Sequence, residues 1–284
     1  TNPGLTEDSQ TVSEANRPDG SRNATGENEA KTEGTIRVDA KGEAGTLTIN
    51  GDTEHQIQLD AEGNYTGDPV SIKTEYGTLT ITGVSNGEAK YTYELTQTPD
   101  VPGTEVRDDI SIQLEDATHD VASGTLTITI VDDVITSSDD TYSVTEGGEL
   151  TASGNVTDND TVGADGLDRV EWTGLAADSV YELDGASVKL NGEEIGTLST
   201  DAEGNFTFTL NSGYDVPAAG LADLVVGYTA YDRDGDASDA KLTISINPDT
   251  RTPEVVVPPA EEPTDPTNPG LTEDSQTVSE ANRP

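Results

Sequence analysis

Apolar side chains occupy every second position in eight short stretches of this chain, and threonine and serine fill most positions between them. The apolar positions are Leu47/Ile49, Leu79/Ile81, Tyr91/Tyr93/Leu95, Ile110/Ile112/Leu114, Leu126/Ile128/Ile130, Phe206/Phe208/Leu210, Leu224/Val226/Tyr228 and Leu242/Ile244/Ile246. A period of two with β-branched residues is typical of strands that bury one face. Since no stretch shows a convincing helical period, the pattern predicts an all-β fold.

Turn signals separate these stretches, and the pattern of the first half returns in the second. Three Asn-Gly dipeptides are hairpin signals, namely Asn50-Gly51, Asn86-Gly87 and Asn191-Gly192. The stretch Leu114–Asp133 parallels Ala230–Asp249. About seven strands in ~110 residues is the size of an immunoglobulin-like sandwich. We therefore predict two tandem β-sandwich domains, residues 1–134 and 135–250.

The first eighteen residues return at the end of the chain. Thr1–Pro18 and Thr267–Pro284 both read TNPGLTEDSQTVSEANRP, at an offset of 266 positions. A fixed period indicates a tandem array, so residues 267–284 are expected to start the next copy. Residues 251–266 are rich in proline and acid, which predicts an extended linker. Alternatively, Val255–Val257 pairs with the edge of a sheet.

The net charge of the chain limits the classes of partner that it can bind. The chain has 56 Asp and Glu against 14 Lys and Arg, a formal net charge of −42. Nucleic acids and anionic membranes require a positive surface, so the charge argues strongly against both as natural partners. The charge favours multivalent cations or a very salty medium. There is no cysteine, and no apolar run approaches the ~18 residues of a membrane span.

One acidic turn has the pattern of a calcium site. Asp232, Asp234 and Asp236 alternate in a turn that contains Gly235. Ca²⁺ takes six to eight oxygen ligands, and alternating Asp residues bring several oxygens to one point. The later Glu and flanking helices of an EF-hand are missing from the pattern. The alternative is a solvated acidic turn.

The junction between the two predicted domains is a second candidate. Asp132 and Asp133 close one unit, and Asp139 and Asp140 open the next. Asp158, Asp160 and Asp165 follow in a loop of the second unit. Like charges at a joint repel one another, and a shared dication would turn that repulsion into a clamp. The alternative is a flexible, solvated joint.

Several phrases resemble the repeats of giant bacterial adhesins of the repeats-in-toxin (RTX) class, which are exported by type I secretion. TVSEANRPDGS with EGTIRVDAKGEAGTLTING resembles the start of their type I secretion repeat domain, and Val106–Asp133 resembles its end. ASGNVTDNDTVGADG and YDRDGDASDAKLTISI resemble their cadherin-like repeats. The resemblance covers roughly residues 10–250, and the order of the phrases makes it specific.

The resemblance implies immunoglobulin-like/cadherin-like extender domains that stiffen with Ca²⁺ and lie on an outer bacterial surface. It implies a monomeric rod segment whose partners are neighbouring repeats of the same chain. It also suggests Glu14 and Asp19 as ligands at an amino-terminal joint. Where the family carries an Asp-rich turn, this chain reads Glu115-Asp116-Ala117-Thr118-His119-Asp120, which leaves Asp116 as a ligand of a weaker site.

The sequence predicts a spacer and no enzyme. Only two histidines, His55 and His119, are present, and no nucleophile elbow, phosphate loop or dinucleotide fingerprint occurs. The alternative is a glycan- or surface-binding module of the same adhesin, for which Trp172 is a sugar-stacking candidate, although a strand tryptophan that helps to form the core explains it better. An accessory domain of a secreted hydrolase is a third possibility.

Overall fold

The computed structural model describes residues 2–22 and 30–251. These residues form the predicted all-β fold of two tandem β-sandwiches. The first sandwich has two five-stranded sheets. One contains β1 (Gly4–Leu5), β3 (Lys31–Asp39), β8 (Glu88–Leu95), β7 (Gly77–Ser85) and β6 (Val70–Lys73), in that order. The other contains β2 (Asp8–Ser13), β10 (Val121–Val131), β9 (Val106–Asp116), β4 (Gly45–Ile49) and β5 (Ile57–Leu59).

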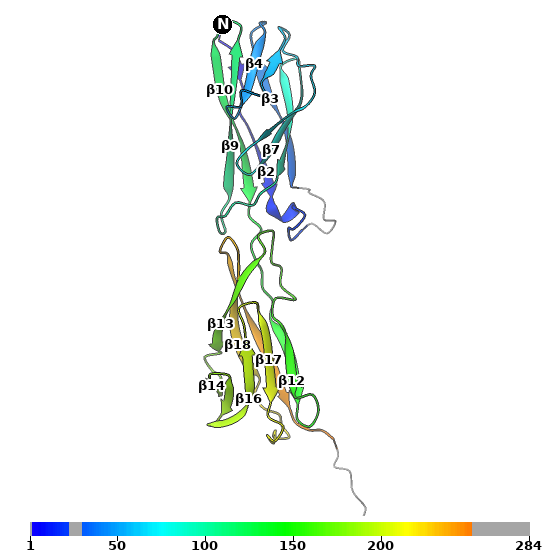
Figure 1. Cartoon of the computed structure of the whole chain (residues 1–284), viewed down its shortest axis with the longest axis vertical. Helices are drawn as coiled ribbons and strands as arrows, with labels where there is room; N and C mark the ends of the chain where they lie inside the picture. The colour runs from blue at the N-terminus through cyan, green and yellow to red at the C-terminus, as the bar shows by residue number, and fades with distance from the viewer. Residues whose placement is uncertain (1, 23–29, 252–284) are drawn as a thin grey trace, which may run out of the picture. The chain divides into compact units, whose positions relative to one another are not determined.

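The second sandwich combines a four-stranded and a five-stranded sheet. The first of these contains β11 (Asp140–Thr145), β19 (Ala237–Asn247), β18 (Leu224–Asp232) and β13 (Leu167–Leu175). The other contains β12 (Thr151–Asn155), β17 (Asn205–Leu210), β16 (Glu193–Thr200), β15 (Ser187–Leu190) and β14 (Tyr181–Asp184). Neighbouring β16 and β17 run side by side (Figure 1).

Two of the three Asn-Gly dipeptides close two-residue hairpins. Asn86-Gly87 joins β7 to β8, and Asn191-Gly192 joins β15 to β16. Both residues of each pair have a positive φ, which is the conformation that a type I′ turn requires. Asn50-Gly51 has the same backbone conformation, but it begins the longer loop between β4 and β5.

In each sandwich an early strand runs parallel to the last one. Strand β2 pairs with β10 from Asp8↔Leu126 to Ser13↔Val131. Strand β11 pairs with β19 in the same way, from Asp140↔Leu242 onward. A short 3₁₀ helix, η1 (Glu14–Asn16), follows β2 directly. The parallel register therefore places η1 beside the residues that follow β10.

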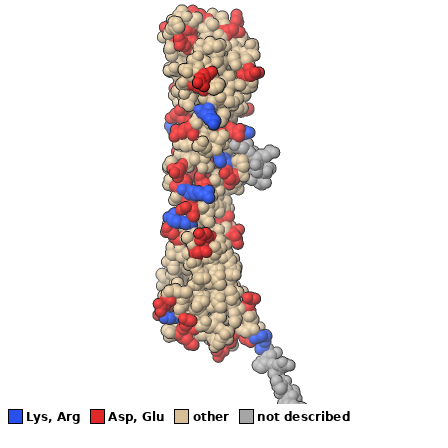
Figure 2. All heavy atoms as spheres, viewed as in Figure 1, with Lys and Arg blue, Asp and Glu red and all other residues tan. Residues whose placement is uncertain are grey.

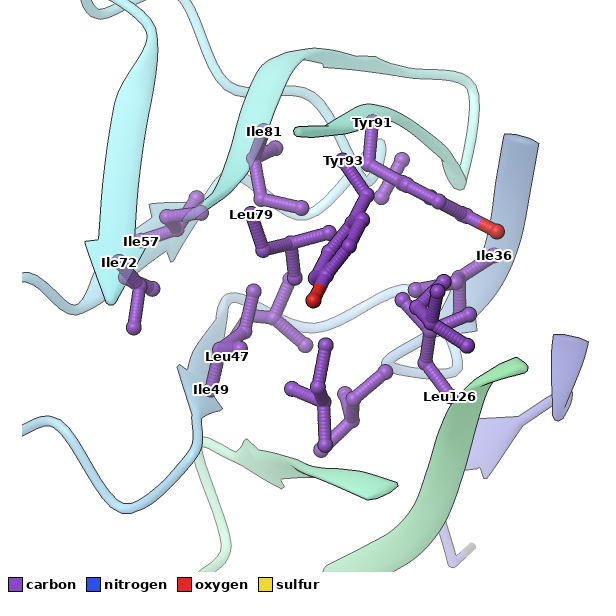
Figure 3. Packing of buried hydrophobic residues seen from close by; sticks show 14 of the residues in the cluster. Ile36, Leu47, Ile49, Ile57, Ile72, Leu79, Ile81, Tyr91, Tyr93 and Leu126 are labelled. Atoms are coloured by element: carbon purple, nitrogen blue, oxygen red, sulfur yellow. The ribbon is translucent and has the colours of Figure 1, made fainter. Parts of the chain in front are cut away.

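Each sandwich has its own core, built from the alternating positions. All eight predicted stretches are strands, and their apolar side chains are buried. In the first core Leu79, Ile81 and Tyr93 from one sheet face Leu47 and Ile49 from the other (Figure 3). Full burial of each large apolar side chain contributes about 1.5–3 kcal/mol. A separate cluster around Phe208 and Tyr228 fills the second sandwich.

The predicted boundary at 134/135 falls between β10 and β11 and stays a prediction. The expected linker at 251–266 and the start of a next copy at 267–284 lie outside the described residues, apart from Arg251. Acidic side chains are spread over the visible face of the molecule, with a few Lys and Arg between them (Figure 2). No helix in the described residues is long and apolar enough to cross a membrane.

Candidate metal centre

Carboxylates from separate parts of the chain meet where β10 ends. Glu14, Asp132 and Asp165 each offer an oxygen, and the three oxygens lie within 4.8 Å of one another. Asp132, Asp234 and Asp236 form a second such group. We call them the two triads. Because Asp132 belongs to both, they form one continuous cluster that combines acids of the first sandwich with acids of the second.

Several oxygens of this cluster are buried without a partner. Glu14 is only 2% exposed, and its Oε2 atom has no hydrogen-bond donor. One oxygen each of Asp165, Asp234 and Asp236 is also buried without a hydrogen-bond partner. A buried, unpaired carboxylate is costly. These atoms therefore point to a positive charge as the missing partner.

The pKa values of the cluster agree with this view. Burial, together with the charges of Asp165 and Asp132, raises the pKa of Glu14 to about 9. Burial, a hydrogen bond with Asp236 and the charges of Asp234 and Asp236 raise the pKa of Asp132 to about 6. Burial also raises the pKa of Asp165. Without a cation, the folded chain retains protons here at pH values where free carboxyls have lost them.

The turn between β18 and β19 orients the second triad. The Oδ1 atom of Asp232 accepts hydrogen bonds from the backbone N–H groups of Gly235 and Asp236, at 3.2 and 2.7 Å. Its Oδ2 atom accepts one from the N–H of Ile135 at 3.3 Å. Both oxygens of the Asp232 carboxylate thus accept hydrogen bonds from the backbone. The turn leaves Asp234 and Asp236, the other two predicted ligands, beside Asp132.

The turn between β9 and β10 is the counterpart in the first sandwich. Asp116 Oδ1 accepts hydrogen bonds from the N–H groups of Thr118 and Asp120, at 2.9 and 3.0 Å, so Asp116 takes the place of Asp232. Thr118 stands where the second sandwich has Asp234, and its hydroxyl also bonds to Asp116. Among the described residues, no group of three potential ligands includes Asp116.

Asp133 lies beside the triads but has other partners. Its carboxylate accepts hydrogen bonds from the N–H and hydroxyl of Ser21 and from the N–H of Ala164, the N–H groups at 2.8 and 3.0 Å. These bonds join the loop after η1 to the loop before β13 without a metal. Asp19 forms an ion pair with Arg17, with Nε and Oδ1 3.1 Å apart. Neither Asp133 nor Asp19 belongs to a triad.

The structure places two groups of predicted ligands differently from the expected joint. Asp139 and Asp140 were expected to share ions with Asp132 and Asp133, but Asp140 pairs with Leu242 on β19. Leu242 lies six residues past Asp236, and at about 3.3 Å per residue this is roughly 20 Å along the strand. Glu14 was expected at an amino-terminal joint. The parallel β2–β10 pairing places it instead beside Asp132.

The acids at the start of β11 form a separate group. Asp140 is buried, its Oδ2 atom accepts a hydrogen bond from the Tyr228 hydroxyl at 3.0 Å, and burial raises its pKa to about 6. Asp160 accepts a hydrogen bond from the Ser138 N–H at 2.8 Å. The charges of Asp160, Asp139 and Asp158 all act on Asp140. Their oxygens do not converge as those of the triads do.

A hollow of about 450 Å³ borders one residue of each triad, Asp165 and Asp234. Asp19, Asp100, Asp165, Arg233 and Asp234 are among the residues that line it. The Arg233 Nη1 atom donates a hydrogen bond to the backbone carbonyl of Asp165 at 3.3 Å, which helps to hold that loop.

Trp172 is a packing residue, as the sequence favoured. Its indole N–H donates a hydrogen bond to the carbonyl of Asp201 at 2.8 Å. Its ring lies against that of Tyr228, with centroids 5.8 Å apart. The ring is therefore partly buried and held by contacts within the second sandwich.

No protein-family model matches this chain, and no curated protein matches it. Among solved structures it is similar to Drosophila N-cadherin EC1-3, with 12% identity over 85% of this chain and 63% of that chain and a TM-score of 0.36. It is also similar to zebrafish RET cadherin-like domains 1 to 4, with 12% identity over 87% of this chain and 51% of that chain and a TM-score of 0.31. A third similar structure is the Ig1-2 module of the Drosophila receptor protein tyrosine phosphatase DLAR, with 9% identity over 87% of this chain and 100% of that chain and a TM-score of 0.23.

This chain thus spans about half the length of the RET structure. The similar structures are cadherin-like and immunoglobulin-like domains. Scores and identities this low bear on neither the ligands nor the activity of this chain.

Proposed function

We propose that this chain is a Ca²⁺-stiffened spacer of a bacterial cell-surface adhesin, which projects a distal ligand-binding region for adhesion or biofilm formation. The observation that carries the proposal is the pair of triads that share Asp132. They combine acids of both sandwiches, so a dication bound there would hold the two sandwiches together. Without it, the same charges would push them apart.

Calcium is the metal that suits these donors. All five side chains of the triads are carboxylates, and the chain has no cysteine. Hard oxygen donors without nitrogen or sulfur favour Ca²⁺ over zinc or copper. Glu14, Asp132 and Asp165 would hold one ion, and Asp132, Asp234 and Asp236 another. Asp133 would set the loop geometry through its hydrogen bonds.

The stiffness of the chain would then depend on whether it lies inside or outside the cell. Extracellular calcium modules bind the ion with a Kd of about 10⁻⁴–10⁻³ M. Sites of that affinity are empty in a cytosol and filled outside the cell. The chain would therefore be loose before export and stiff after it.

The assignment to a bacterial adhesin rests on the repeated segment and on the resemblance of the sequence phrases to RTX adhesins. In this scheme residues 1–134, 135–250 and 251–266 form one repeat unit, and residues 267–284 open the next. The unit is a monomeric rod segment whose partners are its neighbouring repeats.

The experiment compares the chain in 10 mM Ca²⁺ and in EDTA, by melting temperature and by small-angle scattering. Two sites with a Kd of 0.1–1 mM would each add about 1.4–2.7 kcal/mol to the free energy of unfolding. We expect a higher melting temperature and a narrower range of scattering radii with Ca²⁺. If neither quantity changes, the calcium proposal is wrong.

A further inference from the structure

The connection between the two sandwiches is very short. Strand β10 ends at Val131. Ile135 already belongs to the core of the second sandwich, where it is buried, and its N–H donates a hydrogen bond to Asp232 at 3.3 Å. Only residues 132–134 therefore separate the two sandwiches, so any relative motion must take place within these three residues.

Asp133 lies in the middle of this connection and holds a loop of each sandwich. Its side chain is buried. The Oδ2 atom accepts a hydrogen bond from the N–H of Ser21 in the first sandwich at 2.8 Å and one from the N–H of Ala164 in the second at 3.0 Å. The Ser21 hydroxyl donates to Oδ1. Hydrogen bonds to an ionised acceptor are stronger than those between neutral groups, so one carboxylate joins the two loops firmly.

The backbone of Asp133 makes a second contact with the second sandwich. A Cβ at Gly163 would lie only 2.1 Å from the carbonyl oxygen of Asp133. Gly163 has a φ of +80°, a conformation that glycine adopts without steric cost. The loop before β13 is thus shaped to approach Asp133 closely.

These contacts differ in kind from those of the triads. The Asp133 carboxylate has N–H and O–H donors as partners and needs no cation. The triads bring carboxylates together, and these repel one another unless a cation lies between them. One part of the joint therefore holds without metal, and the other part does not.

We propose that Asp133, Ser21, Gly163 and Ala164, here called the pin, keep the two sandwiches docked when the triads are empty. The empty joint then pivots within residues 132–134 and opens on the side of the triads, while the loops at the pin stay together. Calcium closes this hinge and does not have to bring two separated sandwiches together. Only this effect of calcium rests on the function proposed above, because the pin itself involves no metal.

The pin acts on orientation more than on unfolding. If the two loops part, Ser21 remains bonded to Asp133, and water replaces the N–H of Ala164. Exchange of a protein donor for water changes the free energy only modestly. The property to measure is therefore the range of orientations of the two sandwiches, rather than a melting temperature.

The absence of cysteine allows spin labels to be attached at chosen sites. Arg107 on β9 and Lys241 on β19 are exposed and lie one in each sandwich, so Arg107→Cys and Lys241→Cys give one labelled pair. Pulsed electron spin resonance then measures the distribution of distances between the labels. The labelled chain is compared with the same chain carrying Asp133→Ala, and Glu182→Ala on the exposed face of β14 is the control.

In EDTA we expect a confined distance distribution for the labelled chain and the control, and a clearly broader one for Asp133→Ala. Equal widths with and without Asp133→Ala, or an unconfined distribution in the unsubstituted labelled chain, overturn the pin. Adding Ca²⁺ separates the two proposals. Narrowing by Ca²⁺ without an effect of Asp133→Ala in EDTA leaves the calcium site standing and removes the pin; broadening by Asp133→Ala without an effect of Ca²⁺ does the reverse.

A second pair of variants covers the case in which loss of the Asp133 side chain disturbs folding. Gly163→Ala keeps every side chain of the pin but places a methyl group against the Asp133 backbone. Gly185→Ala is the matched control, because Gly185 also has a positive φ but a Cβ there meets nothing within 4 Å. In EDTA only Gly163→Ala should broaden the distribution. Equal distributions for these two variants would contradict the proposed docking.

Discussion

At the scale of single residues, the shared carboxylate of Asp132 is the centre of the candidate site. It is the residue common to both triads, and its Oδ2 atom also accepts a hydrogen bond from the Gly103 N–H at 2.8 Å. The carboxylates of Asp133 and Asp232 accept hydrogen bonds from backbone donors and belong to neither triad. Loss of Asp132 should therefore affect both ions, and loss of Glu14 only one.

We predict that Asp132→Asn removes most of the Ca²⁺-induced stabilisation. An amide carries no charge, so each triad loses one of its three carboxylates and the bridging ligand. The gain of about 1.4–2.7 kcal/mol per site should fall below about 1 kcal/mol in total, measured by urea unfolding with and without Ca²⁺. Glu182→Gln, on the exposed face of β14, is the control and should keep the full gain.

The metal-free chain should also become less stable as the pH rises. Glu14 has a pKa of about 9 in the folded chain, against 4.5 as its ordinary value. Between these values the folded chain binds a proton that the unfolded chain has released. The free energy of unfolding should therefore decrease with rising pH, by at most about 1.4 kcal/mol per pH unit from this group.

The measurement is urea unfolding of the metal-stripped chain from pH 5 to 9, with Glu14→Gln as the comparison. The variant should show a shallower decrease, because its amide does not titrate. An equally steep decrease in the variant would show that Glu14 is not the source.

At the scale of elements, strands and hairpins follow from the sequence, while the candidate site does so only in part. The period of two fixes the buried side chains from Leu47 to Ile246 because alternation is local. The Asp234/Asp236 turn is equally local. The place of Glu14 depends on a parallel pairing between β2 and β10, strands far apart in sequence, and no periodic pattern carries that register. The separation of Asp140 from Asp132 has the same origin.

Two glycines of Asn-Gly turns test how hairpin geometry stabilises the first sandwich. Gly87 and Gly51 both have a positive φ, 73° and 68°. A Cβ at Gly87 would lie 2.8 Å from the carbonyl oxygen of Val38, whereas a Cβ at Gly51 meets nothing within 4 Å. Gly51→Ala should cost about 1–2 kcal/mol from backbone strain alone. Gly87→Ala should cost more, because β3 must also shift.

Urea unfolding of the two variants in Ca²⁺ measures the difference. Equal losses would mean that the close approach of β3 to the β7–β8 turn does not constrain that hairpin.

At the scale of the whole molecule, the two sandwiches have separate hydrophobic cores and share the candidate metal centre. Separate cores favour separate unfolding transitions, and a shared ion would couple them, because it binds only when both sides of the centre are folded.

The variant Phe208→Ala tests this coupling, since Phe208 is fully buried in the second core and its loss should cost about 3–5 kcal/mol of unfolding free energy. In EDTA, calorimetry should show the transition of the second sandwich shifted down and that of the first unchanged. In 10 mM Ca²⁺ the first sandwich should lose part of its calcium-dependent stabilisation as well, because the unfolded neighbour no longer supplies Asp165, Asp234 and Asp236. A first transition that is unaffected in both conditions would show that the ions, if bound, do not link the two sandwiches.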